Sequence, residues 1–348
     1  MTGGEIMHQR QTRNDNGCWC LRIMLRVLLA LAATTAADGA HACAACGNTL
    51  SRDWETQGIT GNQGFVADLS YDYINQNQQR YGTGAASPAL INRQLNAGQE
   101  VESYTRTQTV TASLIYNEDT WGVAAQVPYV QRAHGTYGAV APLGSAYSTS
   151  SDGSIGDVRV IGRYTGWSES RESGLIGGMK FPTGNTRTNF SAGAAAGTPV
   201  DASLQIGTGS TDVVLGGFTT GAVEHYGWFL QGTLQRAIAT QNNFRPGDAL
   251  AINAGVRYAR FGAKVAPMLQ LNIIRRQPDA GLNATPADPV TLSPTTGGTL
   301  AYLAPGISVR VGGGASVYGF VQFPVYQNVN SLQLVPRYTV TLGVRRFF

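Results

Sequence analysis

The chain lacks any long apolar run after residue 43. A transmembrane helix needs about twenty mostly apolar residues, so the sequence predicts none in this part. Charge is also scarce, at 13% of the 348 residues, and Lys180 and Lys264 are the only two lysines. Glycine is abundant instead, with 44 residues. A chain of this length and composition can form one large β domain or two ordinary ones.

The first residues have the form of a secretory leader. Arginines precede an apolar stretch at 27–33, and Ala40-His41-Ala42 supplies a small-x-small cleavage pattern. We expect residues 1–42 to be removed, so that the mature chain starts at Cys43. Met24 is a candidate for the true initiator, because the region before it is long and polar for a leader. A buried N-terminal helix is the alternative.

After the leader, the chain contains few residues of the types that commonly bind metals or act in catalysis. Cys43 and Cys46 form a local disulfide or stay reduced, and two thiols cannot complete a tetrahedral metal site. His134 and His225 are predicted to lie at opposite ends of strands, so they share no site. The small excess of basic residues gives no concentrated stripe for nucleic acid. The sequence therefore predicts no enzyme, no metal, no cofactor and no nucleic-acid partner.

The C-terminal stretch Leu334–Phe348 alternates between apolar and polar residues. Side chains of a strand point alternately to opposite faces, so this strand has one apolar and one polar side. An exposed apolar edge strand would promote aggregation in a soluble protein. A strand of an outer-membrane barrel has this form, with lipid outside and a polar lumen inside. The terminal Phe348 also resembles the signal recognised by the barrel assembly machinery, although Arg346 stands where that signal is usually apolar.

Alternating segments continue from residue 64 to the end, and they predict about twelve strands. Long connections, expected at about 75–102, 133–154 and 183–206, alternate with short ones. Bacterial barrels have short periplasmic turns and long outer loops. We therefore predict an all-β fold, a transmembrane antiparallel up-and-down β-barrel over 64–348. A soluble β-sandwich is the alternative. Residues 43–63 are expected to be irregular, in the periplasm or plugging the lumen.

Several short motifs in one region resemble a known family. Gly156-Asp157-Val158, then Arg163-Tyr164, then Met179–Gly184 and Gly207–Asp212 occur in the order found in the outer-membrane proteins named after the MetA component of phenol degradation pathways, and the terminal Phe348 agrees. The resemblance covers the barrel region, and it does not include the opening at Cys43. It implies a barrel of about this size that passes small, often hydrophobic or aromatic compounds.

Charged residues on the polar parity of the strands are the candidates for lining the lumen. Mixed charges in a pore can set selectivity or lock the interior by ion pairs. The expected function is an outer-membrane channel for a small, hydrophobic or aromatic solute. A non-conducting scaffold that anchors a periplasmic partner is the alternative. The expected partners are outer-membrane lipid, the assembly machinery and the solute. The lumen candidates are Asp68, Asp72, Asp157, Arg159, Arg163, Lys180, Asp212, Arg257, Arg310 and Arg337.

Overall fold

The computed structural model describes residues 50, 63–138, 146–241, 243–258, 264–281 and 295–348, all within the compact unit Gly39–Phe348. The predicted leader, Met24, Cys43 and Cys46 lie outside the described residues, as does most of the segment 43–63. Within the described ranges, no helix has the length and apolar character needed to cross a membrane.

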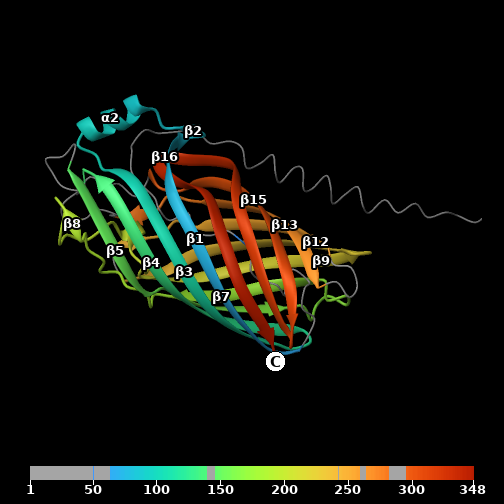
Figure 1. The fold of residues 1–348 in the computed structure, drawn as a ribbon. Helices are drawn as coiled ribbons and strands as arrows, with labels where there is room; N and C mark the ends of the chain where they lie inside the picture. The colour runs from blue at the N-terminus through green and yellow to red at the C-terminus, as the bar shows by residue number, and fades with distance from the viewer. Residues whose placement is uncertain (1–49, 51–62, 139–145, 242, 259–263, 282–294) are drawn as a thin grey trace, which may run out of the picture. The chain divides into compact units, whose positions relative to one another are not determined.

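Eleven strand elements join edge to edge into one closed antiparallel sheet (Figure 1). Each pairs with its neighbour in the order given, and the last pairs with the first. They are β1 (Gly64–Gly82), β3 (Val101–Asn117), β4 (Trp121–Tyr137), β6 (Val158–Tyr164), β7 (Ser173–Phe181), β9 (Ser210–Val223), β10 (Tyr226–Thr240), β12 (Ala249–Tyr258), β13 (Val265–Arg276), β15 (Gly298–Gly312) and β16 (Ala315–Phe347).

The last element, β16, supplies two neighbouring stretches of the wall. Its first half pairs with β15, and its second half pairs with β1. The halves lie side by side, because Phe347 N donates to Gly314 O at 3.0 Å and a Cβ on Gly319 would lie 3.1 Å from Leu342 Cδ2. The expected fold class, an antiparallel transmembrane-type barrel, is confirmed. Counting the halves of β16 separately also accounts for the expected number of strands.

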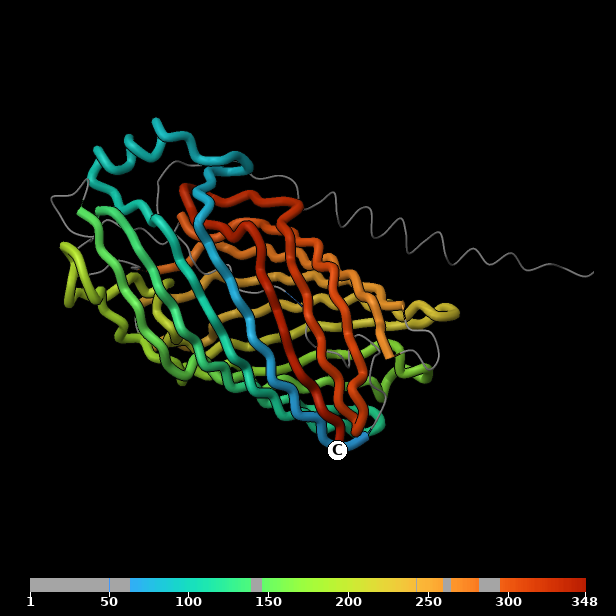
Figure 2. The backbone as a smooth tube through the Cα atoms, in the orientation of Figure 1, coloured from blue at the N-terminus to red at the C-terminus, as the bar shows by residue number. Residues whose placement is uncertain are grey.

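The first and last strands close the barrel by pairing with each other along their length. The C-terminal half of β16 runs along β1, as the red and blue traces show (Figure 2). Phe348 N donates to Phe65 O at 2.9 Å, so the chain ends beside the start of β1. This closure leaves no open edge, which a sheet in lipid could not tolerate.

Apolar side chains face outward in a belt around the barrel. On β4, Trp121, Val123, Val127 and Tyr129 are exposed, and the belt ends at Gln131. Nine residues from Trp121 to Tyr129 match the length of a strand that crosses the hydrocarbon at a tilt. Aromatic residues gather at one rim of the belt, with the rings of Phe65 and Tyr116 4.8 Å apart, of Tyr116 and Trp121 5.7 Å apart, and of Tyr226 and Tyr258 5.1 Å apart. Such aromatic girdles mark membrane interfaces.

Connections at the two ends differ in length as predicted. Residues 118–120, 224–225 and 313–314 make short turns at the end that holds the chain terminus. Residues 83–100 and 182–209 make long loops at the other end. This asymmetry identifies the first end as periplasmic and the second as external.

Two expected loops were partly wrong. The stretch after Asn75 continues β1 to Gly82, and α2 (Pro88–Asn96) follows. This helix begins at Ser87, whose side chain accepts from Leu90 N at 3.2 Å. Likewise β4 continues to Tyr137 and pairs with β5 (Tyr147–Ile155) beyond the membrane belt. Polar composition hid both extensions, because strands outside the lipid need no apolar face.

Smaller elements complete the external side. They are β2 (Gly84–Ala85), β8 (Ala192–Gly193), η1 (Ala202–Leu204), β11 (Phe244–Arg245) and β14 (Ala280–Gly281).

Candidate functional site

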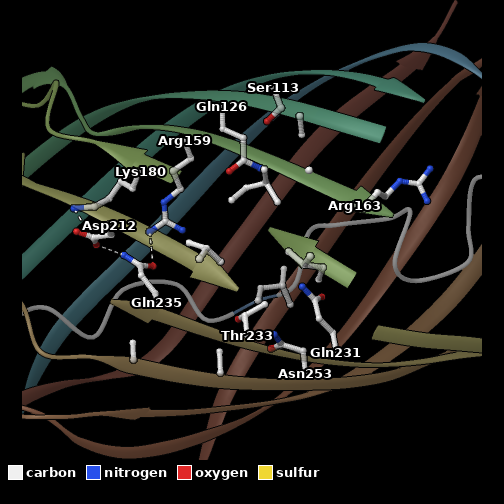
Figure 3. A pocket seen from close by; sticks show the side chains of 18 of the residues that line it. Ser113, Gln126, Arg159, Arg163, Lys180, Asp212, Gln231, Thr233, Gln235 and Asn253 are labelled. Atoms are coloured by element: carbon white, nitrogen blue, oxygen red, sulfur yellow. Dashed lines mark hydrogen bonds and ion pairs between the residues drawn. The ribbon is translucent and has the colours of Figure 1, made fainter. Parts of the chain in front are cut away.

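A cavity of about 400 Å³ lies inside the barrel (Figure 3). Its wall comes from inward-facing residues of several strands, because alternate side chains of each strand point inward. On β6, for example, Arg159 and Arg163 line the cavity while Val160 and Tyr164 are exposed on the outside. Amides and hydroxyls line much of the remainder: Ser113, Asn117, Gln126, Thr208, Gln231, Thr233, Gln235 and Asn253.

A buried ionic cluster lies in the wall beside this cavity. Lys180 Nζ lies 3.1 Å from Asp157 Oδ2 and 3.3 Å from Asp212 Oδ2, and all three side chains are less than a tenth exposed. Lys180 also donates to Ser210 Oγ at 3.1 Å and to the hydroxyl of Thr208. One cation between two carboxylates, with hydroxyls filling the remaining positions, satisfies the charges in a site that water cannot screen.

The cluster extends into the cavity through an amide. Gln235 donates from Nε2 to Asp212 and accepts from Arg159 at 3.3 Å, as the dashed lines show (Figure 3). Arg159 itself is exposed to the lumen. The chain of contacts therefore joins the buried carboxylates to a water-facing arginine.

Three of the sequence motifs, those at 156–158, 179–184 and 207–212, converge on this cluster. Asp157 accepts from Gly184 N and from Thr208 N, each at 3.0 Å. Thr183 Oγ1 donates to Gly156 O at 2.8 Å. A Cβ on Gly207 would lie 2.4 Å from the Gly184 carbonyl carbon, so this backbone approach requires glycine. The motifs therefore fasten both ends of the loop 182–209 to the wall.

That loop folds onto the inward side of the β4–β5 hairpin. Arg132 donates to the carbonyl oxygens of Leu204 and Gln205 at 2.8 and 2.9 Å. Phe190 lies 6.3 Å from the His134 ring, measured between centroids. The loop has a small apolar core of its own, formed by Phe190, Ala195, Val200 and Leu204.

Glu102 and His134 are buried titratable groups in this external region, beyond the membrane belt. Burial, with a smaller contribution from Glu100, raises the pKa of Glu102 to about 8. Burial, together with nearby Arg132, lowers the pKa of His134 to about 3. Its Nδ1 lies 2.9 Å from Thr105 Oγ1. Both side chains are therefore uncharged in the folded protein at neutral pH.

A second buried ion pair closes the seam between β1 and β16. Asp68 and Arg345 are directly paired in the register, and Arg345 Nε lies 3.2 Å from Asp68 Oδ2. Tyr318 Oη donates to the same carboxylate at 3.1 Å. Farther out, Thr341 Oγ1 donates to Asp72 at 2.7 Å. These contacts keep both aspartates buried in the wall.

Five of the predicted lumen residues line the cavity itself: Asp68, Arg159, Arg163, Lys180 and Asp212. Asp157 and Asp72 lie buried in the wall next to it. The positive charges of Arg257 and Arg310 repel each other. Both residues lie near the periplasmic ends of their strands, β12 and β15.

Arg337 lies on the opposite side of the wall from the one expected. Thr339 pairs with Ile74 and Pro336 with Gln76, all four being buried. Arg337 and Tyr338 therefore stand opposite the single residue Asn75, which is a β-bulge. Both are exposed, on the outward face between two inward pairs. The bulge breaks the period-two count on which the expectation relied.

Several lining residues were absent from the predicted set. Arg276 and Arg345 line the cavity, as do the amides named above. Strand parity could have found Arg345 and the amides, since each shares the inward parity of its strand. Leu50 packs against Met268, Ala304, Tyr318 and Phe320, which belong to β13, β15 and β16.

Among the described residues, no group of three or more His, Cys, Asp or Glu side chains is arranged to hold a metal ion. His134 lies on the external part of β4, and His225 lies in the periplasmic turn next to Tyr258. They are at opposite ends of the barrel, as the sequence predicted.

No protein-family model matches the chain, and no curated protein matches it significantly. Among solved structures, an outer-membrane channel from Pseudomonas putida F1 has a TM-score of 0.56 at 11% identity, over 82% of this chain and 96% of that one. The translocator domain of the autotransporter NalP from Neisseria meningitidis has a TM-score of 0.44 at 11% identity, covering 96% of this chain and 98% of that one. The toluene transporter TbuX from Ralstonia pickettii has 0.40 at 11% identity, covering 82% and 90%.

The first likeness shows the fold alone, and the other two are too distant to add to it. The barrel has the fold of the outer-membrane proteins of Gram-negative bacteria, and its outer surface carries a matching apolar belt. The predicted location in the outer membrane is confirmed.

Proposed function

We propose that the chain is an outer-membrane channel that passes a small solute. The observation that carries this proposal is a cavity of about 400 Å³ inside a closed barrel, lined by both polar and aliphatic side chains. Its size falls in the range of about 300–1,000 Å³ that is usual for sites of small molecules. A closed wall with an apolar exterior and a partly polar interior can connect the two sides of a membrane.

We further propose that the solute is hydrophobic or aromatic and that the chain is a relative of the proteins named after MetA. Ile115, Ile161, Ile176 and Val214 line the cavity between the amides. Aliphatic walls with a few fixed polar groups are typical of sites that orient an apolar molecule. The convergence of three of the family motifs on one cluster supports the relationship.

The role we propose involves no catalysis. A nucleophile and its base must lie within hydrogen-bond reach of each other. His134, the histidine on the inward face of β4, is buried and has the hydroxyl of Thr105 as its neighbour, on the external side of the belt.

Planar-bilayer recordings of the folded full chain test the channel. We expect discrete conductance steps in a simple salt. Well-folded protein that carries no current would contradict the proposal.

For the aromatic solute, a deletion strain should grow more slowly than its parent on low concentrations of an aromatic carbon source. Equal growth on every aromatic compound tried would exclude this solute class.

A non-conducting scaffold is the second candidate. The packing of Leu50 among inward-facing side chains favours the absence of conductance, because this residue lies inside the barrel. In this case the rest of the segment 43–63 would engage a periplasmic partner, and the barrel would serve as an anchor. Deleting 43–63 distinguishes the two. A barrel that stays silent with and without the segment supports the scaffold, whereas current in either form supports the channel.

A further inference from the structure

Two exposed arginines lie on the outward face of the barrel, on either side of β1. Asn75 of β1 pairs with Arg106 of β3 on one side, and on the other side it stands opposite the bulge of β16 that holds Arg337. The three strands lie side by side, as the teal, blue and dark red traces show (Figure 2). Neighbouring strands are about 4.8 Å apart, so the two arginines are about 10 Å apart along the wall and can reach a common group between them.

Both arginines lie just beyond the external edge of the membrane belt. On β16, Tyr338 belongs to the belt, and Arg337 is the next residue toward the external side. On β3 the belt ends at Val110, the partner of Tyr129, and Arg106 lies farther out on the same face. Tyrosines gather at membrane interfaces, and long basic side chains next to them extend to the headgroups. Each arginine is therefore placed at the level of the outer headgroups.

The two guanidinium groups are not neutralised by the described part of the protein. Among the described residues, neither Arg106 nor Arg337 has a side-chain hydrogen bond, an ion pair or a ring contact. The acidic residues of β1, β3 and β16 are Asp68, Asp72 and Glu102, and all three are buried. No carboxylate of these strands therefore competes for the outward arginines.

The bulge in β16 is the feature that turns Arg337 outward. In a regular ladder neighbouring residues alternate between the two faces, so either Arg337 or Tyr338 would point inward. The bulge places both on the outward face, where a tyrosine suits the membrane interface and an arginine suits the headgroups beyond it. Bulges commonly direct a side chain toward a functional site. This one interrupts the seam that closes the barrel, so a function at Arg337 accounts for its presence.

From these observations we propose that Arg106, Asn75 and Arg337 bind a phosphate group of a glycolipid in the outer leaflet of the membrane. A guanidinium group binds phosphate by two parallel hydrogen bonds, and the amide of Asn75 adds a further donor. The site lies on the outward face, so the acyl chains can stay against the apolar belt while the wall holds the phosphate. The proposal does not depend on conduction, because a scaffold in the outer membrane would present the same face.

Binding of purified lipid A to the full chain in a neutral detergent tests the proposal, with native mass spectrometry to count the bound lipids. Lipid A that carries both phosphates should bind at least about tenfold more tightly than the same lipid without phosphates, because each basic residue near a charged headgroup adds to the attraction. Raising the salt to about 1 M should reduce this preference. An excess of inorganic phosphate should leave the lipid bound, and complete displacement would assign the site to free phosphate instead.

Two double variants remove the same charge from different places. Arg106→Gln with Arg337→Gln should weaken the binding of phosphorylated lipid A by about tenfold or more and leave that of the dephosphorylated lipid unchanged. Arg236→Gln with Lys264→Gln is the matched control. Arg236 is exposed but lies 3.6 Å from Asp248, and Lys264 is exposed at the periplasmic end of β13. The control should bind lipid A as the parent does, and the mobility of unheated samples on gels checks that each variant is folded.

Three results would overturn the site. The first is a folded Arg106→Gln, Arg337→Gln barrel that binds phosphorylated lipid A as tightly as the parent. The second is an equal loss in both double variants, because binding would then follow net charge and not position. The third is equal binding of lipid A with and without its phosphates.

Discussion

Replacing Lys180 by methionine should destabilise the barrel more than any other single change of charge in its wall. The ammonium group lies between Asp157 and Asp212, and the three side chains are 3–7% exposed. Methionine keeps most of the volume and removes the charge, so two buried carboxylates would face each other without a cation. Removing one partner of a buried ion pair typically costs about 3–5 kcal/mol, because the remaining charge is uncompensated.

Urea unfolding of the purified barrel measures this effect, with the fraction of folded protein read from the gel mobility of unheated samples. The midpoint should fall in Lys180→Met and recover partly in the triple variant that adds Asp157→Asn and Asp212→Asn, since the triple variant buries no charge. Lys264→Met is the matched control, because Lys264 is exposed. Its midpoint should equal that of the parent protein.

Two results would refute this reasoning. A Lys180→Met barrel as stable as the parent would show that the carboxylates are protonated or hydrated in the folded state. A triple variant less stable than Lys180→Met would show that hydrogen bonds to the carboxylates, and not charge compensation, hold the cluster together.

The remaining predictions concern pH, backbone approach and closure. Glu102 has its pKa raised from 4.5 to about 8, so the folded state retains a proton that the unfolded state loses. Stability should therefore fall as pH rises from about 4.5 to 8, by up to about 1.4 kcal/mol per unit, and Glu102→Gln should abolish this fall in urea midpoints. His134 has its pKa lowered from 6.5 to about 3, so its contribution should be lost as pH falls through this window; an unchanged acid limb in His134→Gln would contradict the burial effect. Gly207→Ala should loosen the loop 182–209, seen as faster proteolysis within it, because the added methyl group would overlap the Gly184 backbone. Deleting Phe348 should reduce the amount of folded barrel in cells without changing the midpoint of the protein that does fold, and equal yields would exclude recognition of this residue.

The sequence predicted the strands best within the membrane belt, where lipid on one side and the lumen on the other require apolar and polar side chains to alternate. Apolar side chains of the β4 belt alternate with lumen residues because the two faces meet different solvents, so the strand could be predicted from period two alone. Beyond Gln131 the outward face meets water and the alternation disappears. The hairpin of β4 and β5 therefore could not be found, although it continues as a regular ladder.

The alternation of inward and outward side chains also predicted residues of the candidate site. The prediction was wrong where a bulge interrupts that alternation. Lys180, Asp212 and Arg159 follow their strand parity and face inward. Arg337 lies on a bulge, which a parity count cannot detect. The meeting of Asp157 with Lys180 and Thr208 depends on strand register and on a loop that returns to the wall, and neither is encoded in local periodicity.

The most direct test of a conducting lumen compares two adjacent positions on β4. Ala124 lines the cavity, and Ala125 is exposed on the outside. In a background with Cys43→Ser and Cys46→Ser, Ala124→Cys and Ala125→Cys would each be treated with a bulky thiol reagent during single-channel recording. We expect the current to fall sharply only for Ala124→Cys. Equal currents for the two labelled proteins, or block through Ala125→Cys alone, would contradict a passage through the barrel.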